Sequence, residues 1–170
     1  MSMVLARPPI RLANKSAGSA RKQAQGKRMG YVELTIKVEN YGDRLAVQNS
    51  NGKPKKKAQP VRAVIIPDAL VDTGTLHLCL PVRYIKQLGL HRHPGTLKAQ
   101  TANGYVERRT FGGAWLTIQD RSDEFTVVEL PDSAPTLIGV VPLEVLDFIV
   151  DPTEQKLIGK HGKQRVCLMY

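Results

Sequence analysis

Apolar and polar residues alternate with a period of two from Val32 to Val38, a pattern that predicts a half-buried β-strand. Helical segments are predicted over residues 81–88, ending at Gly89, and over residues 142–148, which are expected to form the only substantial helix. Further short apolar runs bounded by turn residues predict strands over residues 61–66, 69–71, 76–80, 96–100, 105–110, 114–118, 125–130, 148–150 and 156–158. Many short strands with one helix indicate an all-β, mostly antiparallel, single-domain barrel.

Turn residues separate these predicted strands. Asn103-Gly104 lies between two strand-like runs, which is the strongest local signal for a β-hairpin. Residues 40–43, Asn-Tyr-Gly-Asp, are expected to form a turn, and Pro67-Asp68 is expected to end the strand over residues 61–66. Residues 49–57 are polar and rich in lysine, and they predict an exposed extension of a hairpin.

Positive charge is concentrated near the two ends of the sequence. Residues 1–29 carry seven Lys or Arg side chains and no acidic one, and residues 160–170 add three basic side chains, again without an acidic one. These ten match the net charge of +10, so residues 30–159 are close to electroneutral. The first segment lacks any sustained period, which predicts a flexible basic arm, and residues 160–170 are expected to form a basic and apolar tail.

Two interpretations of the basic segments remain open. The tails and the lysines at 53–57 can make weak electrostatic contacts with nucleic acid or with acidic partners. A solvated loop and a solubilising tail explain the same charges equally well. No aromatic residue lies between these lysines, so stacking on bases has little support.

Composition favours a cytoplasmic protein without membrane contact. A chain of 170 residues with 42% hydrophobic residues can bury one ordinary core, and no apolar run approaches the roughly 20 residues needed to cross a bilayer. Arg7-Pro8-Pro9 interrupts the stretch where a secretory signal needs continuous apolar residues. Cys79 and Cys167 show no disulfide framework spacing and fit free thiols in a reducing compartment.

Asp72-Thr73-Gly74 follows two apolar residues at the end of a predicted strand. This tripeptide arises by chance in a chain of this length with a probability on the order of a few per cent. The glycine permits a tight turn, and backbone amides can then approach the carboxylate. A second segment, Leu137-Ile138-Gly139, has the same combination of two hydrophobic residues and a glycine, and an apolar-periodic stretch follows it. The two segments together make Asp72 the strongest candidate for a functional carboxylate.

The order and spacing of these segments resemble those of the retropepsin-like aspartic proteases, and most closely the small single-domain members found in bacteria and archaea. The resemblance spans residues 31–158. It implies an all-β, single-domain, retropepsin-like closed β-barrel over residues 30–159 that has one short C-terminal helix and acts as a homodimer. The segments that carry it are Ala69-Leu70-Val71-Asp72-Thr73-Gly74-Thr75, Leu80-Pro81, Leu88-Gly89-Leu90, Ala102-Asn103-Gly104, Leu137-Ile138-Gly139, Leu143-Glu144-Val145-Leu146 and Asp151-Pro152.

The activity implied by the resemblance is that of an aspartic endopeptidase. Such an enzyme activates water between two carboxylates, and this chain carries one motif, so Asp72 of each of two subunits would meet at a two-fold axis. Thr73 would hydrogen-bond across that axis, and Gly74 would leave room for both carboxylates. The Thr75 hydroxyl would donate to the outer oxygen of Asp72 and stabilise its ionised form, which predicts an acidic working range.

Substrate binding is also implied by the resemblance. An extended peptide would lie between the carboxylates and a flap, held by main-chain hydrogen bonds. The flap tip and substrate-binding positions are Thr75, Ala102, Asn103, Gly104, Leu137, Ile138 and Gly139, and the candidate pocket-lining residues are Val71, Leu76, Ile138 and Val140.

The sequence departs from the viral pattern at the expected dimer contact. Retroviral relatives usually carry an arginine after the second glycine, where it braces the dimer, whereas this chain has Val140-Val141. The interleaved terminal strands of viral dimers have no clear counterpart, although residues 166–170 are apolar enough to form an interface strand.

Alternative interpretations of these residues stay open. Asp72 could cap a turn, and the chain could be a non-catalytic barrel that binds peptides or tethers partners through its basic segments. Cys79 near a histidine could be a thiol nucleophile, although a half-buried inert thiol is more common. His77, Cys79, His91 and His93 lack the usual zinc spacings, so we expect neither a metal nor a cofactor.

Overall fold

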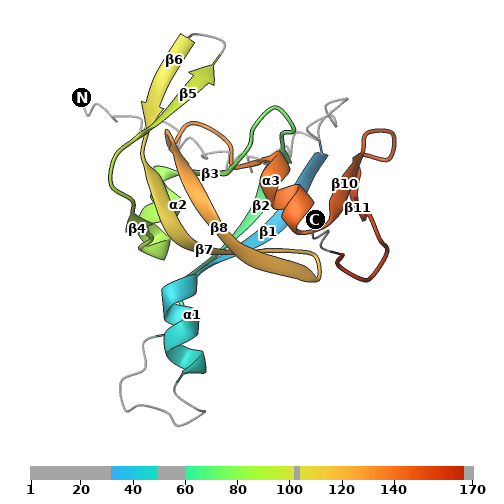
Figure 1. The fold of residues 1–170 in the computed structure, drawn as a ribbon, viewed down its shortest axis with the longest axis horizontal. Coiled ribbons are helices and arrows are strands. Elements are labelled where there is room, and N and C mark those ends of the chain that lie inside the picture. The colour runs from blue at the N-terminus through green and yellow to red at the C-terminus, as the bar shows by residue number, and fades with distance from the viewer. Residues whose placement is uncertain (1–31, 50–59, 102–103, 167–170) are drawn as a thin grey trace, which may run out of the picture.

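Six strands close into a barrel in the computed structural model, which describes residues 32–49, 60–101 and 104–166 (Figure 1). β7 (Thr110–Ile118) pairs with β1 (Val32–Asn40) in an antiparallel arrangement and thereby closes the barrel, and β4 (His91–Arg92) adds to the edge of β7. Pairing all around the ring leaves these strands with few unpaired edges, and it confirms the predicted all-β closed barrel. The order around the ring is β1 (Val32–Asn40), β2 (Ala63–Val71), β9 (Leu137–Ile138), β3 (Leu78–Pro81), β8 (Arg121–Leu130) and β7 (Thr110–Ile118).

The short strand β9 lies between two strands that follow each other in sequence. β9 pairs in parallel with β2, where Val71 lies opposite Ile138, and antiparallel with β3, where Leu78 lies opposite Ile138. The loop of residues 72–77 joins β2 to β3 and therefore has to pass over the end of β9. The topology thus brings the Asp72 motif and the Leu137-Ile138-Gly139 motif together, although 65 positions separate Asp72 from Leu137.

Two hairpins form separate two-stranded sheets beside the barrel (Figure 1). β5 (Leu97–Thr101) and β6 (Gly104–Arg108) pair antiparallel with Thr101 opposite Gly104, which confirms the hairpin predicted from Asn103-Gly104. β10 (Phe148–Asp151) and β11 (Lys156–Gly159) form the second hairpin, as the two predicted strands require.

One helix occurs where the sequence analysis predicts a turn. Residues 41–48 form α1 (Tyr41–Gln48), because Asn40 acts as its N-cap and accepts a hydrogen bond from the backbone amide of Asp43 at 3.0 Å. The longest of the described helices is therefore α1, and the expectation of a single substantial helix near the C-terminus is wrong in this respect.

The other two helices follow the predictions more closely. α2 (Val82–Leu88) ends at Gly89, which has a φ of 60° in the left-handed region that favours glycine. α3 (Val140–Val145) is the predicted C-terminal helix, but it begins two residues earlier and ends three residues before the predicted end. The helix stops there because the chain turns at Asp147, whose φ of 58° is incompatible with a right-handed helix.

Strand β2 continues through Pro67, whereas the sequence analysis places a break at Pro67-Asp68. The register against β1 shifts between Leu34 and Ile36, so β2 carries an extra residue at this bulge. A bulge tolerates proline because one residue of the bulged strand is left out of the hydrogen-bond ladder. A single long strand therefore runs from Ala63 to Val71 and delivers Asp72.

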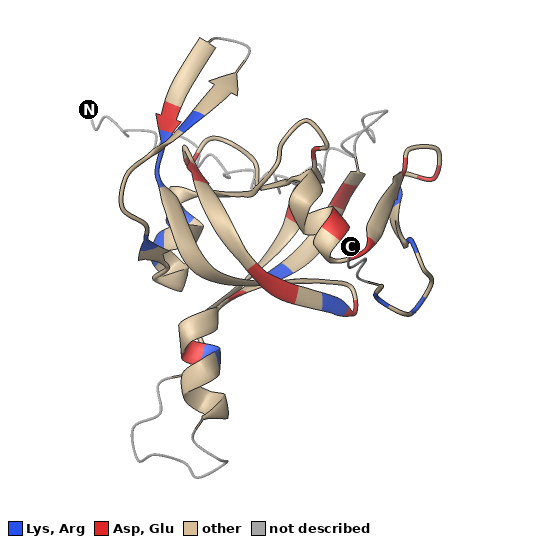
Figure 2. Cartoon of the chain, in the orientation of Figure 1, with Lys and Arg blue, Asp and Glu red and all other residues tan. Residues whose placement is uncertain are grey.

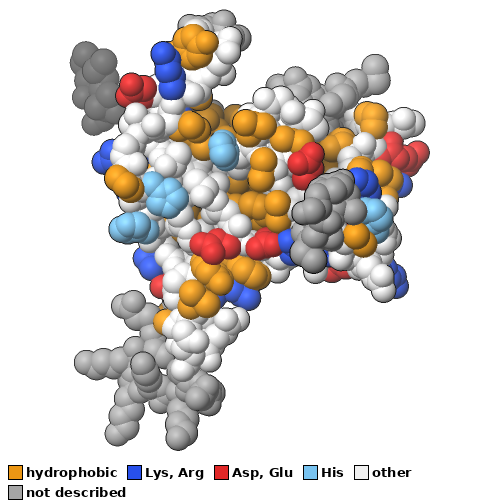
Figure 3. Space-filling model, viewed as in Figure 1, with side chains coloured by type: hydrophobic (Ala, Val, Ile, Leu, Met, Phe, Trp, Pro, Cys, Tyr) orange, Lys and Arg blue, Asp and Glu red, His pale blue; other side chains and the backbone are white. Residues whose placement is uncertain are grey.

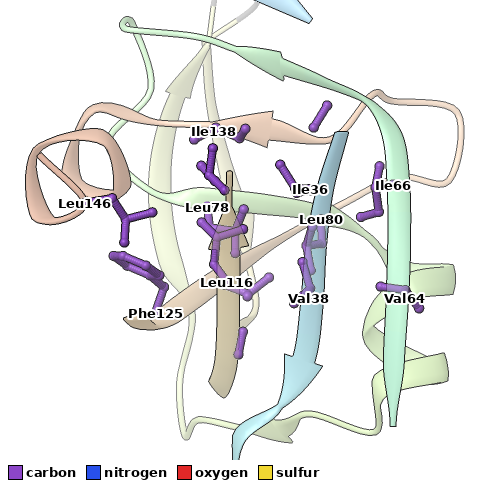
Figure 4. Packing of buried hydrophobic residues seen from close by; sticks show 14 of the residues in the cluster. Ile36, Val38, Val64, Ile66, Leu78, Leu80, Leu116, Phe125, Ile138 and Leu146 are labelled. Carbon is purple, nitrogen blue, oxygen red and sulfur yellow. The ribbon is translucent and has the colours of Figure 1, made fainter. Parts of the chain in front are cut away.

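The barrel interior is filled by branched apolar side chains from opposing strands (Figure 4). Alternate residues of each strand point inward, so Ile36 and Val38 are buried while Lys37 between them is exposed. Burial of each such side chain contributes roughly 1.5–3 kcal/mol of hydrophobic free energy. The fully buried set includes Ile36, Val38, Ile66, Leu78, Leu80, Leu116, Ile118, Val127, Ile138 and Leu146.

Several predicted segments lie outside the described residues. These are the basic arm, the lysines at 53–57, the flap residues Ala102 and Asn103, and residues 167–170, which include Cys167. Within the described part of the chain, no helix has the length and apolar character needed to cross a membrane.

Candidate active site

The loop that follows β2 holds Asp72 at one end of the barrel. The Asp72 amide donates to the Ile138 carbonyl oxygen at 3.0 Å, so the start of the loop is anchored on β9. The Gly74 amide donates to Oδ1 of Asp72 at 2.9 Å, and the Thr75 amide donates to the Asp72 carbonyl oxygen at 3.1 Å. The carboxylate is half-buried, while Thr73 and Gly74 are exposed. A backbone amide therefore holds and stabilises one carboxylate oxygen at a position that is open to solvent.

Three successive amides after β9 fasten the rest of this loop. Gly139, Val140 and Val141 donate to the carbonyl oxygens of His77, Thr75 and Leu76 at 3.1, 2.8 and 3.1 Å. These bonds join the first turn of α3 to the residues that follow Gly74. The Leu137-Ile138-Gly139 motif thus supports the Asp72 loop through backbone hydrogen bonds that do not depend on side-chain type.

A glycine is required at position 139 because no side chain fits there, and not because the backbone has an unusual conformation. Its φ is −80° and its ψ is 178°, an extended conformation that any residue can adopt. A Cβ atom at this position would lie 2.5 Å from the Leu76 carbonyl carbon and 2.6 Å from the carbonyl oxygens of Thr75 and His77. These contacts are all with backbone, so a side chain at Gly139 would push the loop away.

Gly74 also provides space, beside the carboxylate itself. A Cβ atom there would lie 3.2 Å from Oδ1 of Asp72, closer than side-chain carbons usually approach. The φ of Gly74 is outside the left-handed region, so the turn does not need a glycine for its backbone angles. Absence of a side chain keeps the exposed side of the Asp72 loop open.

The predicted substrate-site residues around this loop differ in exposure. Ile138 is fully buried and Gly139 is buried, so these two residues support the loop from the side of the barrel. Leu137 is half-buried in the parallel pair with Leu70. Leu76, in contrast, is 61% exposed beside the Asp72 loop and is available to a ligand.

Val71, Thr75 and Val140 are the other residues predicted to take part in the site at this loop. Val71 and Thr75 are half-buried. Among the hydrogen bonds of the described chain, Asp72 receives one from the Gly74 amide and none from the Thr75 hydroxyl. The backbone amide of Thr75 instead bonds to the Asp72 carbonyl oxygen, and Val140 lines the same cavity as Thr73.

Cys79 lies buried beneath the same loop. Burial raises the pKa of its thiol to about 11, and the negative charge of Asp72 adds to the shift. Its Sγ lies 3.7 Å from the His77 carbonyl oxygen and forms a weak hydrogen bond. A thiol that stays protonated at neutral pH is a poor nucleophile, so this environment favours the inert, buried thiol over the catalytic one.

The β5–β6 hairpin contains Gly104, one of the predicted flap positions. In Figure 1 the hairpin and the loop that joins β2 to β3 both lie toward the top of the barrel. Thr101 donates its hydroxyl hydrogen to the Gly104 carbonyl oxygen at 2.8 Å, and the positive φ of Gly104, 104°, suits a tight hairpin turn. Gly104 is exposed.

The histidines and the cysteine considered as metal ligands do not come together. His91 belongs to β4, His93 follows this strand and its ring packs over Gly112, whereas His77 and Cys79 belong to the region of the Asp72 loop. Within the described residues, no three His, Cys, Asp or Glu side chains are close enough to hold a metal ion.

A buried ionic cluster near α3 was not foreseen from the sequence. Arg121 lies at the start of β8, and it donates to a carboxylate oxygen of Asp147 at 3.0 Å and to the carbonyl oxygen of Leu146 at 2.8 Å. His161 Nδ1 lies 2.7 Å from the other oxygen of Asp147. Burial alone would raise the pKa of the Asp147 carboxyl, but hydrogen bonds from His161 and Arg121 lower it below its usual value.

This cluster positions the segment that follows β11. Arg121 also bonds to the carbonyl oxygens of Gly162 and Gln164, so residues 160–165 are attached to the barrel. The partners are 25 to 43 positions away from Arg121 in sequence. No local pattern could have revealed these contacts, and only the position of Asp147 between apolar residues hinted at them.

A cavity of about 650 Å³ lies beside Thr73, between α3, β10 and the segment after β11. Its apolar wall includes Val140, Leu143 and Val145, and its polar rim includes Glu144 and Lys160. The cavity is continuous with the exposed side of the Asp72 loop, because Thr73 belongs to both. The sequence predicts a role in the site for two of its lining residues, Thr73 and Val140.

Comparison with known protein families shows the family of this chain. A comparison with curated proteins gives no significant match. Among solved structures, the chain is similar to the EIAV protease in complex with the inhibitor HBY-793, with 17% sequence identity and a TM-score of 0.39 over 48% of this chain and 75% of that chain. The family model described as aspartyl protease matches residues 51–142, which include the Asp72 loop and Gly139. Since this match covers more than half of the sequence, the chain belongs to the aspartyl protease family.

Proposed function

We propose that this chain is an aspartic endopeptidase whose active site forms between two identical subunits. The observation that carries this proposal is the half-buried Asp72 carboxylate, which accepts a hydrogen bond from the Gly74 amide and lies on a loop whose residues 75–77 pack closely against Gly139. Hydrolysis by an aspartic dyad needs two carboxylates that share one proton. Asp72 is the only aspartate of the sequence followed by Thr-Gly or Ser-Gly, so the second carboxylate has to come from another copy.

In the proposed mechanism the two Asp72 side chains have different roles. The ionised carboxylate accepts a proton from the attacking water, while the protonated one donates a hydrogen bond to the scissile carbonyl oxygen. Collapse of the tetrahedral intermediate returns a proton to the leaving amine. The Gly74 amide fixes the carboxylate orientation in each subunit, and the proposed contact of Thr73 across the axis joins the two loops.

We propose an extended peptide as the substrate. It would lie between the Asp72 loop and the β5–β6 hairpin, where strand-like main-chain hydrogen bonds give affinity and side-chain pockets give selectivity. Leu76 is exposed and Val71 half-buried beside the loop, so both can contribute to an apolar pocket. Closure of the hairpin would exclude water other than the attacking molecule.

The domain limits and the compartment belong to the same proposal. We assign residues 30–159 to the protease domain, residues 1–29 to a basic arm and residues 160–170 to a tail whose first part is attached to the barrel by Arg121. Reduced thiols, with Cys79 buried and protonated, suit the cytoplasm. Contact of the basic segments with nucleic acid or acidic partners stays a prediction from charge alone.

The proposal is tested by cleavage of a denatured protein between about pH 4 and pH 7, the range in which aspartic dyads titrate. Wild type is compared with Asp72→Asn and with Asp120→Asn, a control at an exposed turn between β7 and β8. We expect the first substitution to abolish cleavage and the second to leave it unchanged. A wild-type dimer that cleaves nothing would contradict the proposal and support the non-catalytic peptide-binding module.

A further inference from the structure

Helix α3 connects the Asp72 loop to the buried Arg121 cluster. The first turn of the helix is bonded to the loop, because the amides of residues 139–141 donate to the carbonyl oxygens of residues 75–77. The carbonyl oxygen of Leu146, directly after the helix, accepts a hydrogen bond from Arg121 at 2.8 Å. Figure 2 shows α3 and the start of β8, which carries Arg121, in the same part of the molecule. At about 1.5 Å per residue, the six residues of α3 place about 9 Å between the two attachments.

Hydrogen bonds within α3 join these two attachments. The Leu143 amide donates to the Gly139 carbonyl oxygen at 3.4 Å, and the Leu146 amide donates to the Pro142 carbonyl oxygen at 3.0 Å. A short helix that is bonded in this way moves as one piece, and rigid elements of this kind can carry coupling between two sites. A displacement of Leu146 is therefore passed to residues 139–141 and from them to the Asp72 loop.

Arg121 fixes the far end of α3 from several directions at once. Its guanidinium donates to the Asp147 carboxylate at 3.0 Å and also bonds to the carbonyl oxygens of Asp147, Gly162 and Gln164. A guanidinium is planar and its five N–H donors have fixed directions, so these acceptors are held in one arrangement. The backbone of Asp147 is in the left-handed region, with a φ of 58°, and the bonds from Arg121 hold the turn at this residue.

Stability alone does not account for this ion pair. The side chains of Arg121 and Asp147 are only 5% and 3% exposed, and the cost of removing two charges from water offsets much of the attraction between them. Leu143 and Leu146 already anchor the helix in the core, since both are buried, but apolar contacts have no fixed direction. The directional bonds of Arg121 add a defined position of the helix end.

His161 lies on the exposed side of the same cluster. Its Nδ1 atom lies 2.7 Å from Oδ1 of Asp147, and its side chain is 38% exposed. Figure 3 shows histidine, acidic and basic side chains on the surface in the region of α3 and the β10–β11 hairpin. Substitution of this half-exposed residue would weaken the hold on Asp147 and leave the bonds of Arg121 in place.

We propose that Arg121 is a positioning residue of the active site, which holds the Asp72 loop in its working position through α3. This inference rests on the proposed function and adds a residue that lies outside both sequence motifs. The chain of contacts runs from Arg121 to Leu146, along α3 to residues 139–141, and on to the loop that carries Asp72.

Three variants and one control test this link. Arg121→Lys keeps the positive charge beside Asp147, but a lysine cannot bond to all the carbonyl oxygens that the guanidinium reaches. Arg121→Met removes every donor and leaves Asp147 buried without this partner, so it should have the larger effect, and His161→Ala should have the smaller one. Asn40→Ala is the control, because the Asn40 side chain also bonds to backbone groups, but to those of α1 and the end of α2. Urea denaturation would confirm that each variant is folded under the assay conditions.

Amide hydrogen exchange is the first readout, because it reports on the Asp72 loop without requiring activity. We expect the amides of residues 139–141 and of Gly74 to exchange about 10-fold or more faster in Arg121→Lys than in wild type, while amides in the β3–β8 pairing change far less. A merely structural role of Arg121 would accelerate exchange at all these amides alike. In Asn40→Ala, exchange at residues 139–141 and at Gly74 should rise no more than exchange in the β3–β8 pairing.

Peptide cleavage is the second readout, measured at subunit concentrations where the specific activity no longer rises with concentration. A loop that is held less firmly should lower kcat about 10-fold in Arg121→Lys and keep KM within about two-fold, because the substrate contacts stay the same. Arg121→Met should lose more of its kcat than Arg121→Lys does. Asn40→Ala should keep the kcat and the KM of wild type.

Exchange and cleavage together separate this inference from the proposed function. If wild type cleaves peptides and Arg121→Lys matches it in loop exchange and in kcat, the inference is overturned and the protease stands. Equal acceleration of all amides, with the same loss of kcat in Asn40→Ala, would also overturn it, because global destabilisation would then explain the effect. Faster exchange confined to residues 139–141 and Gly74, without any cleavage by wild type, would support the link through α3 and overturn the protease. If neither Arg121 variant folds, the comparison of His161→Ala with Asn40→Ala decides in the same way.

Discussion

Substitution of Gly139 by alanine is the sharpest test of how the two motifs cooperate. The added Cβ would lie 2.5 Å from the Leu76 carbonyl carbon and 2.6 Å from the carbonyl oxygens of Thr75 and His77. These atoms are backbone, so rotation of a side chain cannot relieve the contact. The loop of residues 72–77 would have to move away from β9 by roughly an ångström to reach ordinary van der Waals distance.

Two costs follow from that movement. Overpacking of a buried position costs about 1–3 kcal/mol, and each of the three weakened amide hydrogen bonds contributes about 0.5–1.5 kcal/mol. Because the bonds lengthen without being lost, we expect the free energy of unfolding to fall by about 2–4 kcal/mol. Activity should fall further, since displacement of a catalytic group by about 1 Å can reduce the rate about 100-fold.

Urea denaturation and cleavage assays at one fixed subunit concentration would measure both effects, because the stability of a dimer depends on concentration. Gly42→Ala is the control: Gly42 is exposed in the first turn of α1, where alanine has the higher helix propensity, and the added Cβ would lie 3.2 Å from Oδ1 of Asn40. That oxygen belongs to a side chain that can shift, whereas the atoms around Gly139 are backbone, so we expect the control to change stability by less than about 1 kcal/mol. A Gly139→Ala protein with wild-type stability and activity would refute the proposed support of the Asp72 loop.

Three further predictions concern the barrel and its buried groups. Asn40→Ala removes the N-cap of α1 and two hydrogen bonds to carbonyl oxygens at the end of α2, so thermal or urea unfolding should show a loss of about 1–3 kcal/mol. The thiol of Cys79, with its pKa raised to about 11, should react with a thiol reagent far more slowly in the folded protein than in urea at pH 8. The pKa of Asp147 is lowered on folding, so its contribution to stability is present above its unfolded pKa and should be lost as the pH falls below about 4.

Each of these predictions has a result that contradicts it. If Asn40→Ala has the stability of wild type, water molecules must form the hydrogen bonds that the Asn40 side chain forms in wild type. Equal labelling rates of the folded and unfolded thiol would show that Cys79 is accessible and ionised. For Asp147, the matched variant is Asp147→Asn, and an acid-unfolding profile identical to that of wild type would show that its hydrogen bonds to Arg121 and His161 add no pH-dependent stability.

Local sequence patterns predict the barrel strands well because the alternation of a strand and the residues of a turn lie within a few consecutive positions. Alternation in residues 32–38 and the Asn103-Gly104 turn both predict elements that the structure confirms. The same kind of reasoning fails at residues 40–43, because asparagine, glycine and aspartate are favoured both in turns and at helix N-termini. Proline at position 67 predicts the end of a strand, but a bulge accommodates this residue within β2.

The candidate site is only partly predictable for a different reason. Asp72 and Gly139 carry recognisable motifs, but whether a neighbouring residue faces a ligand or the core depends on strand pairing. Ile138 is enclosed between β2 and β3 and is therefore buried, whereas Leu76 lies outside the pairing and is exposed. The contacts of Arg121 with Asp147 join segments 26 positions apart, and no periodic pattern encodes them.

The central claim is that one active site contains Asp72 from two chains, and the most direct test is to mix wild type with Asp72→Asn. After subunit exchange in an equimolar mixture at constant total protein, one quarter of the dimers should carry two intact carboxylates. Peptide cleavage should then fall to about one quarter of that of undiluted wild type and follow the square of the wild-type fraction. Activity that instead declines in proportion to the wild-type fraction, at about one half, would show that each chain acts alone and would contradict the shared site.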